Sequence, residues 1–132
     1  MTRKQAREQA FILLFEYSFT LDSAEELFAI ASDAGVEEQD DYCQKVVSNA
    51  IDNISEIDET ISKYSKGWST SRISRVALAA LRLAIAEIRY FDDIPASVSI
   101  NECVELIKKY ASDQDASFAN GILGSVVRAV GE

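Results

Sequence analysis

The sequence has no histidine, one proline, five glycines and two cysteines in 132 residues. Without histidine, the chain lacks the side chain that most often acts as a general base near neutral pH. The glycines are too few and too widely spaced for a phosphate-binding loop. We therefore expect no enzymatic activity and no catalytic residues. The scarcity of proline and glycine favours long regular elements.

The two cysteines, Cys43 and Cys103, lie far apart, and each falls in a helical pattern where a buried free thiol is ordinary. With no histidine and no close cysteine pair, zinc has no ligand set, so we expect no metal and no cofactor. No stretch has the roughly 20 consecutive apolar residues of a membrane span. The segment "AFILLFEYSF" contains Glu16 and is interpreted as helix, not signal peptide. The expected location is a reducing cytoplasm.

Basic residues cluster at the start of a chain whose formal net charge is −9. The segment "MTRKQAREQAF" carries Arg3, Lys4 and Arg7, opposed only by Glu8. Arg3 and Arg7 share a helix face, and a guanidinium can bind phosphate oxygens in two hydrogen bonds and stack on bases. The N-terminus of a helix adds a positive dipole. The pattern alone, however, favours an ordinary solvated chain start over an anion site.

The apolar residues recur with a helical period almost throughout, and no segment alternates long enough to form a sheet. The sequence therefore predicts an all-α fold of about seven helices. The first contains Ala6, Ala10 and Leu13. The others are expected near residues 23–34, 38–53, 55–67, 76–88, 97–111 and 115–130, with Ser23 and Glu26 forming a capping box and Gly35 ending the second helix.

The segment from Val76 to Ile88 is apolar nearly all round, which is typical of a helix buried by several neighbours. Its alanines favour either close helix packing or a flat patch for a protein partner, and the pattern does not decide between them. Gly121 and Gly124 interrupt another helical pattern, where they would admit a neighbouring backbone or contact a ligand. We expect one domain, 1–132, built from a three-helix bundle at 1–55 and a second helical bundle at 56–132.

Several ordered motifs resemble the NusB family of bacterial transcription antitermination factors. They are the "RK.AR..A...L" pattern of the first helix, Trp68, "SRI" at 71–73, "LRLAIAEI" at 81–88, "DIP" at 93–95, "INE.VEL.KKY" at 100–110 and "F.NG.L" at 118–123. The resemblance covers nearly the whole chain and is weakest over residues 20–65. It implies two packed helical bundles, in agreement with the periodicity.

The resemblance also implies a function without an enzymatic reaction. NusB-like proteins bind the boxA element of single-stranded leader RNA together with NusE, a small-subunit ribosomal protein. The pair joins RNA polymerase and other Nus factors and promotes antitermination, notably in ribosomal RNA operons. Some family members self-associate, and the sequence leaves open whether this chain forms a homodimer.

Carried over residue by residue, the resemblance implies an RNA-binding set of Arg3, Lys4, Arg7, Phe15, Phe118 and Asn120. The three cations match the arginine-rich first turn of the family, and the last two residues match its "F.NG" helix start. Phe15 stands where many members carry tyrosine. The proposed site would thus have the basic turn at one edge and Phe118 at the other.

Two other functions are weighed against this one. A helical protein–protein adaptor would not bind RNA, and its basic turn would be incidental. NusB-like domains also precede the catalytic domain of some ribosomal RNA cytosine methyltransferases. The present 132 residues contain no cofactor-binding segment, so such an activity would reside elsewhere.

Overall fold

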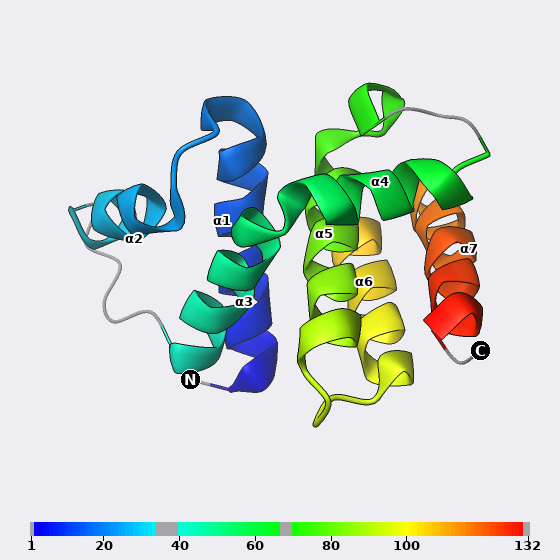
Figure 1. The fold of residues 1–132 in the computed structure, drawn as a ribbon. Helices are drawn as coiled ribbons and strands as arrows, with labels where there is room; N and C mark the ends of the chain where they lie inside the picture. The colour runs from blue at the N-terminus through cyan, green and yellow to red at the C-terminus, as the bar shows by residue number, and fades with distance from the viewer. Residues whose placement is uncertain (1, 34–39, 67–69, 131–132) are drawn as a thin grey trace.

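The computed structural model describes residues 2–33, 40–66 and 70–130, and these residues form helices joined by short connections (Figure 1). The helices are α1 (Arg3–Thr20), α2 (Ala24–Asp33), α3 (Asp41–Asp52), α4 (Ile54–Tyr64), the 3₁₀ turn η1 (Thr70–Arg72), α5 (Arg75–Tyr90), α6 (Ala96–Tyr110) and α7 (Asp113–Val130). The predicted all-α class and the seven α-helices are confirmed for this part of the chain.

Side-chain caps explain where the helices begin. Thr2 caps α1, because its hydroxyl accepts from the backbone N–H of Gln5 and the Gln5 side chain accepts from the Thr2 N–H. The capping box predicted before α2 is confirmed, with Ser23 Oγ 3.2 Å from the Glu26 nitrogen. The predicted boundaries at Gly35, Glu38 and Gly67, and the motif residue Trp68, lie outside the described residues.

Helix α5 is the centre of the molecule. It packs against α1, α3, α4, α6 and α7, and in Figure 1 it stands between the α1–α3 pair and the α6–α7 pair. Every residue from Ala77 to Glu87 is buried, as the nearly continuous apolar pattern predicts. The alanines of this helix therefore serve close helix packing. The alternative of an exposed alanine patch for a protein partner is wrong.

The predicted division between two bundles falls in the first turn of α4, which begins at Ile54. Helix α4 packs against α3 on one side of that division and against α5 and α7 on the other. Helix α1 likewise packs against both α3 and α5. These packed surfaces join the two halves into a continuous core. The division into separate bundles 1–55 and 56–132 stays a prediction.

The two glycines of α7 do not admit a neighbouring backbone. A Cβ built on Gly121 would meet no heavy atom within 4 Å. A Cβ on Gly124 would approach only the Arg128 side chain, with Nη1 at 3.4 Å. The interpretation that these glycines allow a close helix crossing is therefore wrong for both positions.

Replacing Gly121 with alanine is expected to raise the free energy of unfolding by about 0.5–1 kcal/mol. The new methyl group meets open space, and alanine loses less backbone entropy than glycine when the helix forms. Urea denaturation measures the change. Gly124→Ala is the matched control, with a smaller gain expected because the Arg128 side chain must move. A Gly121→Ala protein no more stable than the original would contradict this reasoning.

Candidate functional site

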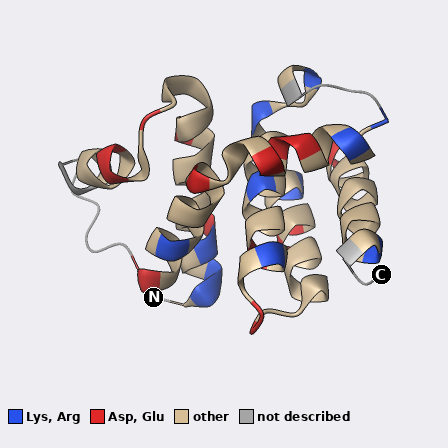
Figure 2. Ribbon diagram, in the orientation of Figure 1, with Lys and Arg blue, Asp and Glu red and all other residues tan. Residues whose placement is uncertain are grey.

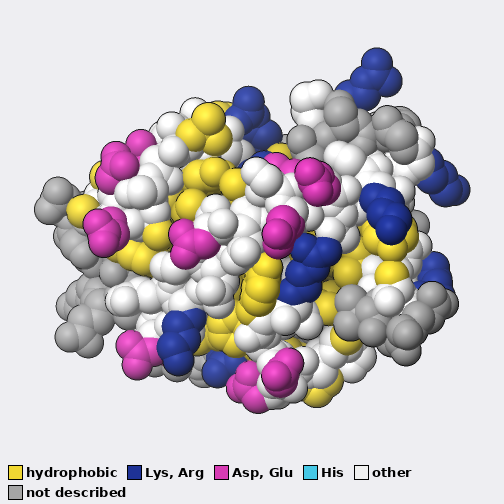
Figure 3. Space-filling view, viewed as in Figure 1, with side chains coloured by type: hydrophobic (Ala, Val, Ile, Leu, Met, Phe, Trp, Pro, Cys, Tyr) yellow, Lys and Arg dark blue, Asp and Glu magenta, His cyan; other side chains and the backbone are white. Residues whose placement is uncertain are grey.

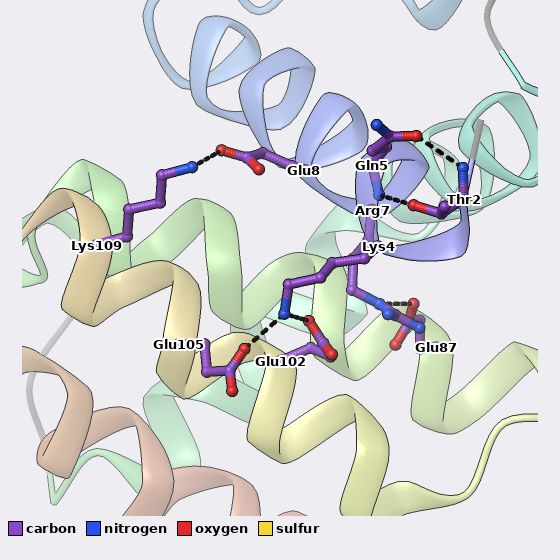
Figure 4. A network of polar contacts seen from close by, with 9 residues as sticks. All are labelled: Thr2, Lys4, Gln5, Arg7, Glu8, Glu87, Glu102, Glu105 and Lys109. Carbon is purple, nitrogen blue, oxygen red and sulfur yellow. Dashed lines mark hydrogen bonds and ion pairs between the residues drawn. The ribbon is translucent and has the colours of Figure 1, made fainter.

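The predicted basic turn begins α1, where the Thr2 capping box holds the first residues in helical geometry. Arg3 and Lys4 are exposed, whereas Arg7 is buried at 5% relative exposure. The three cations therefore differ in what they can contact. Figure 4 shows Lys4 and Arg7 side by side, each directed at carboxylates from another helix.

Arg7 belongs to a buried polar cluster around Glu87 of α5. Arg7 Nε lies 2.8 Å from Glu87 Oε2, and the two side chains are 6% and 1% exposed. The Tyr42 hydroxyl of α3 donates to the same carboxylate, and Ser99 Oγ of α6 donates to its other oxygen at 2.8 Å. The cluster thus joins four helices, and the Arg7 guanidinium faces the core rather than a ligand.

Lys4 spans the gap between α1 and α6. Its Nζ lies 2.7 Å from Glu105 Oε2 and 3.5 Å from Glu102 Oε2. The hydrogen bond with Glu105 and the charges of both carboxylates raise the pKa of Lys4 above its usual value. The same hydrogen bond lowers the pKa of Glu105. Because Lys4 and Glu105 are exposed and Glu102 is only half-buried, the pairs add little to stability, but an incoming anion must compete with them.

A second contact between the same helices follows one turn later. Lys109 Nζ lies 2.7 Å from Glu8 Oε1, and the Tyr110 hydroxyl donates to the same oxygen. These two hydrogen bonds lower the pKa of Glu8. The Tyr110 ring stacks on Phe11 with a centroid separation of 5.3 Å. The α1–α6 seam is therefore lined by paired charges and one aromatic stack.

Arg3 is the cation of the basic turn that no described carboxylate neutralises. Its guanidinium carbon lies 4.3 Å from the centroid of the Tyr42 ring, a cation–π distance. The ring also lies near Arg7, at 5.7 Å. The Arg7–Glu87 cluster therefore fixes Tyr42, and Tyr42 in turn supports the exposed Arg3.

Phe15 lies further along α1, half-buried, with its ring 5.0 Å from that of Phe19 in an edge arrangement. Arg75, the first residue of α5, places its guanidinium 4.2 Å from the Phe19 ring centroid. It also donates from Nη1 to the carbonyl oxygen of Ser18 at 2.5 Å. The second half of α1 is thereby joined to the start of α5.

Phe118 and Asn120 lie on α7, where Asn120 is exposed and Phe118 half-buried. Phe118 lines a cleft of about 230 Å³ together with Arg72, Ile73, Ser74, Gln114 and Asp115. The cleft separates α7 from η1 and the start of α5. It offers an aromatic ring, a guanidinium and several hydrogen-bonding groups within one small space.

The predicted site residues thus fall into two groups. Arg3, Lys4 and Arg7 lie at the start of α1, close to α3, α5 and α6. Phe118 and Asn120 lie on α7, which Figure 1 shows on the far side of α5 and α6. Phe15 lies further along α1 than the first group. The sequence reasoning did not identify Phe19, Arg72 or Arg75. Phe19 follows Phe15 by four residues, a spacing that could have revealed it.

Other kinds of site have little support in the described residues. No three His, Cys, Asp or Glu side chains among them gather as metal ligands. Both cysteines are buried free thiols, as expected. Burial raises the pKa of Cys43 to about 12 and also raises the pKa of Cys103. None of the described helices is both long and apolar enough to cross a membrane.

Comparison with known proteins gives consistent results across the chain. The NusB family model matches residues 4–128. The transcription antitermination protein NusB of Acetivibrio thermocellus is 47% identical, with 97% of this chain and 90% of that protein covered. Its counterpart in Natranaerobius thermophilus is 44% identical, with 96% and 94% covered. The crystal structure of antitermination factors NusB and NusE in complex with dsRNA contains a chain with a TM-score of 0.83 and 30% identity, covering 98% of this chain and 99% of that one.

Proposed function

The chain belongs to the NusB family of transcription antitermination factors, which are not enzymes, and we propose that it binds boxA leader RNA together with NusE. In this proposal it joins RNA polymerase and other Nus factors in the cytoplasm and promotes antitermination of ribosomal RNA operons. The observation that carries the proposal is the similarity, over 98% of the chain, to a protein crystallised with NusE and dsRNA. The proposal further specifies that the RNA is the single-stranded boxA element.

The three cations of the basic turn have different roles in this proposal, because their surroundings differ. Arg3 is exposed and supported by Tyr42, so its guanidinium is available to a phosphate or a base. Lys4 contributes only when an anion displaces it from Glu102 and Glu105. Arg7 acts as a positioning residue, because its guanidinium is held by Glu87 inside the protein.

The aromatic residues provide stacking surfaces. A base can stack on any aromatic ring, which suits a single strand whose bases are unpaired. Phe15 lies on α1 and Phe118 in the α7 cleft, so stacking can occur at two separate places along an RNA strand. Asn120 follows Phe118 by two residues on α7 and is exposed, and its amide can donate to and accept from a base edge.

The charge distribution supports binding at one part of the surface. Figure 3 shows acidic side chains spread over α2, α3 and α4 on the face drawn there. RNA phosphates are repelled from such a surface, and the repulsion is screened only beyond about 10 Å at ordinary salt. The acidic regions would thus restrict RNA to the basic and aromatic parts of the molecule.

Replacing Phe118 with alanine is expected to weaken boxA RNA binding by about 1–3 kcal/mol, or about 5- to 150-fold, through the loss of one base stack. Fluorescence anisotropy of labelled RNA, with and without NusE, measures the affinity. Phe28→Ala, which removes a half-buried ring from α2, is the matched control and should bind as the original protein does. Circular dichroism checks that both variants are folded.

Two outcomes of this titration would count against the proposal. Equal affinity of the Phe118→Ala and Phe28→Ala proteins would remove Phe118 from the site. Absence of RNA binding by the unsubstituted protein, even with NusE, would favour the protein–protein adaptor. A NusE pull-down that survives ribonuclease would then support that second function.

A further inference from the structure

The start of α5 carries cations that the described carboxylates do not neutralise. Arg72 ends η1 and Arg75 begins α5, and both are exposed. Neither forms an ion pair within residues 2–33, 40–66 and 70–130, whereas four other cations in these ranges do. Figure 2 shows the basic positions of η1 and of the first turn of α5 close together. No acidic residue lies in that turn, so the helix dipole adds to their charge.

Arg75 is held against an exposed aromatic ring. Phe19, near the end of α1, is 58% exposed. The Arg75 guanidinium covers one part of this ring at 4.2 Å and is fixed by its hydrogen bond to Ser18. The pair presents a flat apolar surface and a positive charge at the same place, as single-stranded nucleic acid sites do.

Arg72 lines the same cleft as Phe118. The cleft volume is about 230 Å³, enough to admit one small planar group. Gln114 and Asp115 line the cleft from α7, so the Asp115 carboxylate comes from a different element than the Arg72 guanidinium. A base inside the cleft would therefore meet hydrogen-bonding groups, and its phosphate would meet the guanidinium.

We propose that Arg72, Arg75 and Phe19 form an RNA-binding edge that connects Phe15 with Phe118. This inference rests on the proposed function and adds to it the residues that bind the phosphates between the two stacking places. The need for them follows from the first turn of α1, where Lys4 and Arg7 are paired with carboxylates. The phosphate contacts must then come largely from other cations, and the α5 edge supplies two beside exposed aromatic surface.

The salt dependence of RNA binding tests the edge. For single strands, each neutralised phosphate contributes about −0.7 to the slope of log affinity against log salt. An Arg72→Gln/Arg75→Gln protein should therefore have a slope shallower by about 1.4, and an affinity lower by about 10- to 30-fold at 0.1 M salt. The probe is labelled single-stranded boxA RNA, titrated in the presence of NusE. Arg128→Gln is the matched control, since it removes an exposed arginine near the other end of α7.

Two further variants distinguish binding from structure. Arg75→Lys keeps the charge and should keep most of the salt slope. Phe19→Ala should weaken binding several-fold while leaving the slope unchanged, because it removes stacking surface only. Thermal unfolding checks that every variant is folded at the temperature of the titration.

The outcomes separate this inference from the proposed function. If the original protein binds the RNA and the double variant has the same slope as Arg128→Gln, the α5 edge is overturned and the proposed function stands. If the original protein binds no RNA with NusE present, both fail. If the double variant loses NusE capture while its RNA slope is unchanged, the edge binds protein, which also overturns the inference.

Discussion

Replacing Glu87 with alanine is expected to lower the free energy of unfolding by about 3–5 kcal/mol. Glu87 is 1% exposed and accepts hydrogen bonds from Arg7, Tyr42 and Ser99. Without the carboxylate, the buried Arg7 guanidinium has no opposite charge, and the Tyr42 and Ser99 hydroxyls lose their acceptor. An unpaired buried charge costs much more than the intact pair contributes, which is why the loss is large.

Urea denaturation at neutral pH measures this loss, and a matched double variant isolates its cause. In Arg7→Met/Glu87→Leu both charges are gone and the volume is approximately kept, so this protein should be more stable than either single variant. A loss below about 1 kcal/mol for Glu87→Ala would show that water reaches Arg7 and that the pair is not truly buried.

The same double variant tests the role of Arg7 in RNA binding. If Arg7 only positions Tyr42 and Arg3, a folded protein that lacks both Arg7 and Glu87 should keep the salt slope of the original protein, because the exposed Arg3 charge remains. Its RNA affinity falls only through the lost support of Tyr42. If Arg7 contacts RNA directly, affinity should fall and the salt slope should become shallower. This comparison avoids the ambiguity of Arg7→Ala, whose loss of binding could result from unfolding alone.

The helices could be predicted from sequence because their signals are local. The spacing of Ala6, Ala10 and Leu13, and the Ser23–Glu26 capping box, each depend on residues a few positions apart. Burial of α5 was predicted for the same reason, since its apolar residues surround the helix.

The burial of Arg7 could not be predicted in this way. Its partner Glu87 lies 80 positions away, and nothing near Arg7 in the sequence indicates a buried pair. By periodicity Arg7 belongs to the same helix face as Arg3. Arg7 is nevertheless buried and Arg3 exposed, because Arg7 pairs with Glu87 of α5. Arg75 and Ser18 are likewise 57 positions apart. Residues of the candidate site that depend on helix packing therefore required the structure.

Because α5 packs against most other helices, a cavity in it should cause a second large loss of stability. Leu81 is fully buried at 0% exposure, on the helix that packs against α1, α3, α4, α6 and α7. Replacing it with alanine should lower the free energy of unfolding by about 2–5 kcal/mol, from lost apolar burial and the cavity that remains. Ile30→Ala removes a side chain that is 52% exposed and should change stability by less than about 0.5 kcal/mol.

Calorimetry of the Leu81→Ala protein also tests the division into bundles 1–55 and 56–132. Because α5 packs against helices of both bundles, weakening it should lower one unfolding transition, with calorimetric and van't Hoff enthalpies that agree. If the bundles were independent, the 56–132 part would melt at a lower temperature and the 1–55 part would melt separately. A single shifted transition would mean that the α1 surface and the α7 surface are held in fixed relation by α5. An RNA strand that contacts both would then meet a site already formed before it binds, with little ordering cost.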